Sequence, residues 1–270
     1  MTYRNASLFF SAFLTVAAAF GPSTAEAGRA HVILDANTGQ ILEAENADAI
    51  NYPASLTKMM TLYLTFEALH QKRFGWDDRL VMSENAESKE PYKFAVGAGN
   101  KITVREAVMG MIVLSTNDAA VAVAETLAGS EQAFGQMMTA KARALGMTST
   151  VFTNPAGLPD PNQVTTAADM ARLGLALMRD YPEEYKLFAT TCLTFRSMKF
   201  RGHNNLLSTY PGADGIKTGY TKASGYNLVS SASNGSRRVV GVVLGGDSAA
   251  ERDGQMAALF DKYLGAQSGQ

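Results

Sequence analysis

The sequence predicts an α/β fold in which one antiparallel sheet, built from both ends of the chain, is flanked by helices. Two short apolar runs near the start, residues 31–34 and 40–44, are joined by a turn-rich stretch typical of a β-hairpin. Strand patterns return between residues 215 and 244, whereas residues 103–178 are dominated by helical patterns. A chain with this order of strands and helices buries its apolar faces most simply as one sheet with an all-helical lobe inserted between the two halves of the sheet.

The composition fits one globular domain without a nucleic-acid partner. The chain has 270 residues, 46% of them hydrophobic and 18% charged, with a formal net charge of −1. Balanced charge without basic blocks argues against nucleic-acid binding, and the length allows one sizeable core. Because no internal repeat or linker is visible, we expect residues 28–270 to form a single domain.

The first 27 residues have the pattern of a signal peptide. Arg4 gives a positive start, residues 8–20 are apolar, and Ala25-Glu26-Ala27 fits a cleavage site between small residues. We expect cleavage after Ala27 and export to the periplasm, with no stable membrane anchor left afterwards. The alternative is an uncleaved N-terminal anchor, which the shortness of the apolar run disfavours.

A buried helix is expected soon after the hairpin. Residues 59–69 are apolar almost all round, and Pro53 suits the start of such a helix. Residues 75–102 are typical of a loop with short strands. Thr103 and Glu106 then form a capping box that starts the next helix, which breaks at residues 115–117.

Turn signals divide the rest of the chain. A loop rich in proline, glycine and aspartate covers residues 154–162, and Asn234-Gly235 is a strong hairpin turn. The further helices are expected at residues 119–127, 131–145, 166–178 and 249–264. The C-terminal strands are expected at residues 215–220, 226–233 and 237–244.

The cysteine and the histidines do not indicate a metal or redox site. Cys192 is the only cysteine, so an internal disulfide is impossible, and a buried inert thiol is favoured over a nucleophile. His31, His70 and His203 lack the spacing of metal ligands, which argues against a zinc site.

Ser55 and Lys58 are the first candidates for catalytic chemistry. They are three residues apart at the start of the buried helix and therefore share one face. The helix dipole favours a developing oxyanion at Ser55, and a half-buried lysine loses its proton more easily than one in water. The pair suits a serine nucleophile without a histidine base. The alternative is a solvated serine and lysine at a helix start.

Two further motifs place polar groups where a cleft could form. Ser115-Thr116-Asn117 lies at a turn between helices, from which a hydroxyl and an amide can project. Lys217-Thr218-Gly219 lies on an expected strand, where the lysine supplies positive charge and the glycine would let a substrate backbone approach. Ser83-Glu84-Asn85 repeats the S-x-N pattern away from a helix turn, and we treat it as unrelated to the site.

These three motifs, S-x-x-K, S-x-N and K-T-G in this order, resemble the active-site serine penicillin-recognising enzymes. The sequence most closely resembles the low-molecular-mass D-alanyl-D-alanine carboxypeptidases of peptidase family S11. This closer resemblance lies at residues 53–58, 103–125, 154–158 and 215–226. The resemblance covers about residues 29–264. It implies a β-lactamase/transpeptidase-like fold.

The resemblance implies a role for each motif residue. Ser55 is the acylated nucleophile, Lys58 is its base, and Ser115 relays a proton to the leaving amine. The residues implied to bind substrate are Asn117, Lys217, Thr218, Gly219, Tyr220 and Arg252. The backbone N–H groups of Ser55 and Tyr220 would form the oxyanion hole. No metal and no cofactor is implied.

Within this resemblance, Arg252 serves the terminal carboxylate of the substrate. A carboxypeptidase must recognise a free C-terminus, and a guanidinium offers it two parallel donors. Arg252 can reach the same end of the cleft if the strand of Lys217 lies beside the strand at residues 237–244. The alternative is a surface arginine paired with Glu251 or Asp253.

The implied activity is removal of the terminal D-alanine from peptidoglycan stem peptides through an acyl-enzyme, with β-lactams as acylating inhibitors. A DD-endopeptidase that cleaves peptidoglycan cross-links is the alternative. A β-lactamase is disfavoured because residues 132–182 lack a glutamate to activate the deacylating water. A non-catalytic β-lactam sensor is disfavoured because all the reacting side chains are present.

Two features depart from the family pattern. Thr116 stands where these carboxypeptidases commonly have glycine. Many relatives add a C-terminal β-rich domain and an amphipathic anchoring helix, which the sequence to Gln270 does not contain. We therefore expect the mature protein to be free in the periplasm.

Overall fold

The structure, a computed structural model, describes Met1 and residues 28–265, so the expected signal peptide lies outside the described residues except for its first. Five strands form one antiparallel sheet in the order β2-β1-β9-β8-β7. Its strands are β1 (Ala30–Asp35), β2 (Ile41–Glu45), β7 (Ala213–Thr221), β8 (Gly225–Ser233) and β9 (Arg238–Gly246). The pairing of β1 with β9 joins the two ends of the chain. The expected sheet is confirmed.

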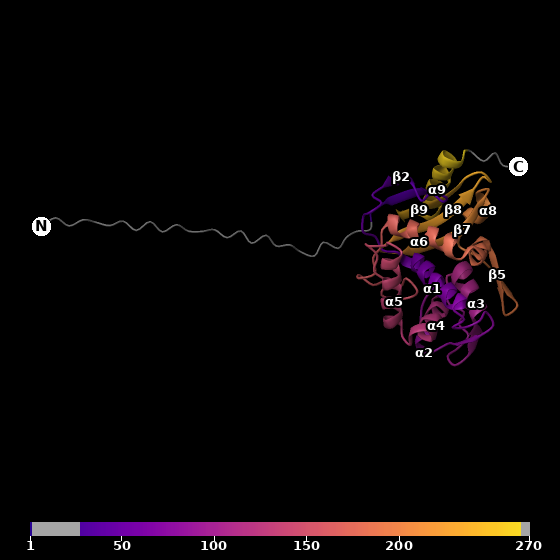
Figure 1. The fold of residues 1–270 in the computed structure, drawn as a ribbon. Coiled ribbons are helices and arrows are strands. Elements are labelled where there is room, and N and C mark those ends of the chain that lie inside the picture. Colours follow the sequence, from indigo (N-terminus) through magenta and orange to yellow (C-terminus); the bar gives the residue numbers. More distant parts are fainter. Residues whose placement is uncertain (2–27, 266–270) are drawn as a thin grey trace.

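Helices cover both faces of this sheet (Figure 1). Side chains alternate along a strand, so on β9 Val242 belongs to the main core and Val243 to the second, smaller core. α6 (Ala167–Asp180) packs on the main-core side, and α9 (Ala249–Leu264) covers the other face with Phe260 fully buried. The closing helix has the expected bounds.

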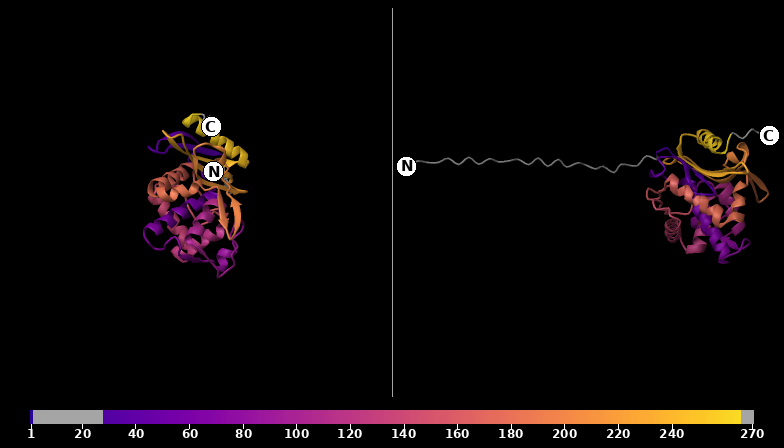
Figure 2. Two further views of the ribbon diagram at one scale, coloured as in Figure 1. Left: turned by 90° about the vertical axis from the view of Figure 1, so that its right-hand side faces the viewer. Right: turned by 45° about the horizontal axis from the view of Figure 1, so that its top comes forward.

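The helical lobe lies on the α6 side of the sheet (Figures 1 and 2). Its central helix, α1 (Lys58–His70), has ten of its thirteen residues buried, as the all-round apolar pattern predicts. Around it lie α3 (Val104–Met109), α4 (Asn117–Ala128) and α5 (Glu131–Ala144). The capping box is confirmed, because Thr103 Oγ1 accepts from the Glu106 N–H and the Glu106 carboxylate accepts from the Thr103 N–H.

The segment between α1 and α3 contains a short helix where the sequence predicts loop and strand. The two short strands are β3 (Arg79–Val81) and β4 (Lys101–Thr103), which pair with each other. Between them lies α2 (Glu84–Glu87), and Ser83 Oγ accepts from the Ala86 N–H as its N-cap. The second S-x-N motif therefore caps this helix.

A second small hairpin was not expected from the sequence. β5 (Cys192–Phe195) pairs with β6 (Met198–Arg201), and the Phe195 ring stacks on Phe94 with the ring centroids 4.1 Å apart. Cys192 is partly exposed on β5, so the expectation of a buried thiol is wrong. The other short helices are α7 (Pro182–Tyr185), η3 (Lys186–Ala189) and α8 (Leu206–Thr209). Within residues 28–265, no helix has the length and apolar character needed to span a membrane.

Candidate active site

Ser55 lies in a tight turn that leads directly into α1. The turn is the 3₁₀ helix η1 (Ala54–Thr57), and Lys58 is the first residue of α1. Ala54 is buried with a φ of 49°, a left-handed value that is uncommon outside glycine. Such a conformation persists where the surroundings enforce it. Ser55 is half-buried while its neighbours in the turn are buried, so its side chain remains open to solvent.

The amine of Lys58 is fully buried, rather than half-buried as the sequence predicts. Its Nζ lies 2.7 Å from Asn117 Oδ1, 2.6 Å from the Ala156 carbonyl oxygen and 3.3 Å from Ser55 Oγ. Burial lowers the pKa of Lys58 well below its ordinary value, and the charge of Lys217 lowers it further. A neutral amine can donate to the two carbonyl oxygens and direct its lone pair at the serine hydroxyl.

Ser115 follows a distorted end of the helix that begins with α3. The helix passes into a π-helical turn, η2 (Gly110–Leu114), and Ser115 comes next with a φ of 61°. Its buried Oγ has no hydrogen-bond partner among the described residues. An unpaired buried hydroxyl costs about 1–3 kcal/mol, so this group is poised to gain from a bound substrate. Thr116 is also buried, and its Oγ1 would lie 2.7 Å from a Cβ added at Gly110.

Asn117 connects the lysine to a loop that borders the site. Its Oδ1 accepts from Lys58, its Nδ2 donates to the Pro91 carbonyl oxygen, and its backbone N–H donates to the Tyr92 carbonyl oxygen. The buried carboxylate of Asp118 fixes the same loop by accepting from two of its backbone N–H groups. Both ends of the Asn117 amide therefore contact protein groups, and the second hydrogen of Nδ2 is left as a further donor.

A loop ordered by Asn154 supplies the second carbonyl group that contacts the buried amine. Asn154 Oδ1 accepts from the backbone N–H groups of Ala156 and Gly157 at 3.2 and 2.8 Å. Gly157 has a φ of 83°, and a Cβ there would lie 1.9 Å from the Ala54 carbonyl oxygen. Glycine therefore allows this loop to pack directly against the turn that carries the nucleophile.

The K-T-G motif lies on β7, the edge strand of the sheet. A Cβ on Gly219 would lie 3.0 Å from the Ser55 backbone nitrogen, so this glycine admits the protein's own backbone, where the sequence predicts a substrate backbone. Lys217 is buried, and its Nζ donates to the Thr218 carbonyl oxygen at 3.0 Å. Burial and the nearby charge of Arg252 lower the pKa of Lys217 to about 7.

Arg252 is buried within electrostatic reach of Lys217, although the strand arrangement differs from the one expected. The expectation for Arg252 rests on the strand of Lys217 lying beside the strand at residues 237–244. In the structure β8 lies between these two strands, β7 and β9, so that premise is wrong. Arg252 is 3% exposed, so it is not a surface arginine. Its Nε and Nη2 lie 2.9 and 2.7 Å from Asp253 Oδ1, and its Nη1 lies 3.4 Å from the Asn227 carbonyl oxygen.

Two residues near the motifs, Asn227 and His203, could not be predicted as part of the site, because no sequence pattern marks them. Asn227 is fully buried on β8, and its Nδ2 donates to the Tyr52 carbonyl oxygen at 2.9 Å, which holds the chain before the nucleophile to the sheet. His203 has an exposed side chain beside Tyr92, with ring centroids 4.9 Å apart. Surrounding protein atoms and the charge of Lys217 nevertheless lower the pKa of His203.

A connected set of contacts joins Ser55, Lys58, Asn117 and Ala156. Two further charges act on this set, because the charge of Lys217 acts on Lys58 and the charge of Arg252 acts on Lys217. The set can take a proton from a serine and attract an anionic group. Over the part of the chain that the structure describes, no three His, Cys, Asp or Glu side chains are grouped to hold a metal ion.

An antiparallel sheet with K-T-G on its edge strand, beside a helix that begins with S-x-x-K, defines the transpeptidase-like class of serine penicillin-recognising proteins. The chain belongs to the Peptidase_S11 family, whose model, described as D-alanyl-D-alanine carboxypeptidase, matches residues 16–248.

Known relatives agree with this assignment. The D-alanyl-D-alanine carboxypeptidase DacA of Haemophilus influenzae is 40% identical over 220 residues, which are 80% of this chain and 56% of the relative. The chain thus spans little more than half the length of this relative. The crystal structure of D-alanyl-D-alanine carboxypeptidase DacD from Francisella tularensis matches with a TM-score of 0.84 and 35% identity, covering 91% of this chain and 72% of that one.

A second similar structure was solved with an antibiotic bound. The ampicillin-bound form of penicillin-binding protein D2 from Listeria monocytogenes matches with a TM-score of 0.77 and 29% identity, covering 87% of this chain and 96% of that one.

Proposed function

We propose that the protein is a serine-type D-alanyl-D-alanine carboxypeptidase that removes the terminal D-alanine from peptidoglycan stem peptides. One observation carries the proposal: the buried Lys58 amine has two carbonyl acceptors and lies 3.3 Å from Ser55 Oγ. This arrangement supports a neutral lysine as the base. The carboxypeptidase names of the family and of the relatives support the choice of substrate.

Acylation begins when Lys58 takes the proton of Ser55. The Ser55 oxygen attacks the carbonyl carbon between the two D-alanines, and the resulting oxyanion accepts hydrogen bonds from the backbone N–H groups of Ser55 and Tyr220. The C–N bond then breaks as Ser115 Oγ gives its proton to the leaving amine and takes a replacement from the protonated Lys58. This step uses the buried Ser115 hydroxyl that has no partner among the described residues. D-Alanine departs, and the rest of the peptide remains bound to Ser55 as an ester.

The substrate carboxylate sets the position of the scissile bond. Lys217 and Arg252 place positive charge at this end of the site, and the Thr218 hydroxyl would donate to the carboxylate. Asn117 would hold Lys58 and donate the second hydrogen of its Nδ2 to the substrate backbone. Hydrolysis follows when a water molecule attacks the ester and gives a proton to Lys58, which returns it to the Ser55 oxygen as the acyl–oxygen bond breaks.

The same chemistry accounts for the expected inhibition by β-lactams. A β-lactam offers a strained amide to the same serine, and the ampicillin-bound Listeria structure supports β-lactams as acylating ligands of this fold.

Residues 28–270 are proposed to form a single catalytic domain that acts in the periplasm after removal of residues 1–27. The signal-peptide pattern of the sequence supports export.

Two muropeptides test the activity. The protein is incubated with a monomer whose stem ends in D-Ala-D-Ala and, separately, with a cross-linked dimer, and the products are analysed by mass spectrometry. Loss of one alanine from the monomer, with an intact dimer, is expected. Conversion of the dimer to monomers without trimming of the monomer would instead identify the alternative DD-endopeptidase activity.

A further inference from the structure

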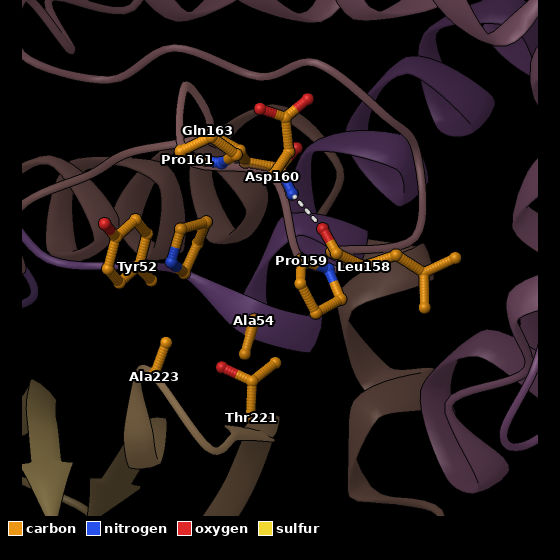
Figure 3. Close-up of a pocket in the computed structure, with 11 residues that line it drawn as sticks. Tyr52, Ala54, Leu158, Pro159, Asp160, Pro161, Gln163, Thr221 and Ala223 are labelled. Atoms are coloured by element: carbon orange, nitrogen blue, oxygen red, sulfur yellow. Dashed lines mark hydrogen bonds between the residues drawn. The ribbon is translucent and has the colours of Figure 1, made fainter.

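A pocket of about 230 Å³ opens directly beside the turn that carries Ser55 (Figure 3). Three segments line it: residues 52–54 before the nucleophile, the loop from Gly157 to Gln163, and the end of β7 with the turn that follows. The volume is several times the about 30 Å³ that one water molecule occupies in the liquid. It can therefore hold a side chain of a bound substrate.

The walls of this pocket are largely apolar and firmly held. Its apolar side chains are Pro53, Ala54, Leu158, Pro159, Pro161 and Ala223. Gln163 is buried, accepts from the backbone N–H groups of Thr153 and Asn154, and donates to the Leu158 carbonyl oxygen at 3.2 Å. Its polar atoms are thus already engaged. An apolar side chain gives up no hydrogen bonds when it enters this pocket. A polar group would give up its hydrogen bonds to water without gaining a new partner from the protein.

The turn after β7 is fixed in the same way. The Thr221 N–H donates to Ser224 Oγ at 2.9 Å, and the Ser224 N–H donates back to Thr221 Oγ1 at 3.0 Å. Two reciprocal hydrogen bonds hold Ala223 at the pocket without help from a ligand. The pocket is therefore preformed, which favours selective binding of one side-chain shape.

The direction of the substrate along β7 identifies which side chain arrives. In the proposed reaction the terminal carboxylate lies near Lys217 and Thr218, and the oxyanion lies at the Tyr220 N–H. The part of the substrate before the scissile bond then continues toward Thr221, three residues and about 10 Å beyond Thr218 on an extended strand. Thr221 is a wall of the pocket.

We propose that this pocket binds the aliphatic side chain of the residue that precedes D-Ala-D-Ala. The inference rests on the proposed function. The straight methylene portion of the side chain lies among the apolar walls, and a polar end, if there is one, remains in water at the margin. Figure 3 shows the Asp160 carboxylate and the Tyr52 hydroxyl at this margin, both pointing away from Ala54.

Peptides that differ in one side chain test the subsite. The kcat/KM values are measured for acetyl-X-D-Ala-D-Ala with X as L-alanine, L-norleucine or L-lysine. Norleucine adds three methylene groups to alanine and is expected to raise kcat/KM by roughly tenfold or more. Lysine is expected within a few-fold of norleucine because its amine stays in water. Lysine no better than alanine, or norleucine no better than alanine, overturns the proposal.

Filling the pocket should remove this preference. Ala223 is exposed on the turn, so Ala223→Trp and the milder Ala223→Leu can fill the pocket without disturbing the core. The norleucine-to-alanine ratio is expected to fall stepwise, toward one in Ala223→Trp. Lys222→Trp is the matched control, because Lys222 lies on the same turn but does not line the pocket. It should keep the wild-type ratio.

The outcomes separate the subsite from the activity. If both Ala223 variants keep the wild-type ratio, or if Lys222→Trp loses it equally, the pocket is not the subsite. If Ala223→Trp cleaves neither peptide, the ratio in Ala223→Leu decides. If the wild-type protein cleaves none of the peptides, the proposed carboxypeptidase activity fails and the subsite fails with it.

Discussion

The Lys58 amine lies 3.3 Å from the Ser55 hydroxyl and is completely buried, so the base and the nucleophile meet where a charged lysine is costly. The short η1 turn creates this relationship by placing the two residues on successive turns at the start of α1. The carbonyl groups of Asn117 and Ala156 then fix the orientation of the amine.

Removal of the Lys58 amine should slow acylation without unfolding the protein. In Lys58→Met the serine loses its base, and the rate of labelling by a fluorescent penicillin should fall by about 10²- to 10⁴-fold. Lys186→Met is the matched control, because Lys186 forms an exposed ion pair with Glu183. The control should label at the wild-type rate. A Lys58→Met protein that labels as fast as the wild type would show that another group is the base.

The pH profile should report the charge of Lys217. Because its pKa is lowered to about 7, the free enzyme loses this positive charge as the pH rises through that value. The kcat/KM for D-Ala-D-Ala peptides should therefore fall on the alkaline side of about pH 7, since kcat/KM reports the free enzyme. Arg252→Gln removes the charge that helps to lower this pKa. The alkaline limb should then move to higher pH, and an unmoved limb would contradict the assignment.

Arg252 should matter most for substrates with a free carboxylate. Loss of a buried charge partner typically costs about 2–5 kcal/mol, so Arg252→Ala should strongly reduce kcat/KM on D-Ala-D-Ala peptides. A C-terminally amidated or thioester analogue without the carboxylate should be affected much less. Because Arg252 also contacts Asp253, thermal unfolding must be measured alongside. Equal losses on both kinds of substrate would assign Arg252 to structural support alone.

Gly157→Ala should damage the site through a steric clash. The added methyl group would lie 1.9 Å from the Ala54 carbonyl oxygen, so the loop and the nucleophile's turn must separate. Strain at a left-handed φ costs about 1–3 kcal/mol in addition. Gly146→Ala is the matched control, because Gly146 has a φ of 77° and nothing within 4 Å of the added atom. Penicillin labelling should fall in Gly157→Ala and persist in Gly146→Ala.

Long helices were predictable from the sequence, and short elements were not. The all-round apolar pattern of α1 specifies this helix locally, and in α9 the N-cap Ser248 accepts from the Glu251 N–H, so the expected positions of both helices agree with the structure. The β5–β6 hairpin and the four-residue α2 have too few residues to set up a period. Tertiary contacts such as the stacking of Phe195 on Phe94 position the hairpin.

The same division applies to the site. The motif residues are recognisable because the chemistry requires their types at fixed spacing, and Ser55 with Lys58 is positioned by one local turn. The full burial of Lys58 depends on residues about 60 and 100 positions away that a spacing pattern does not reveal. Asn227 likewise acts only through tertiary structure, by holding the Tyr52 carbonyl group to β8.

The most direct test of this account is the site of covalent acylation. The protein is treated with penicillin, digested, and mapped by mass spectrometry, with Ser55→Ala treated in parallel. We expect one adduct, on the peptide that contains Ser55, and no labelling of Ser55→Ala. A Ser55→Ala protein that still carries the label, or an adduct mapped to another residue of the wild type, would contradict Ser55 as the nucleophile.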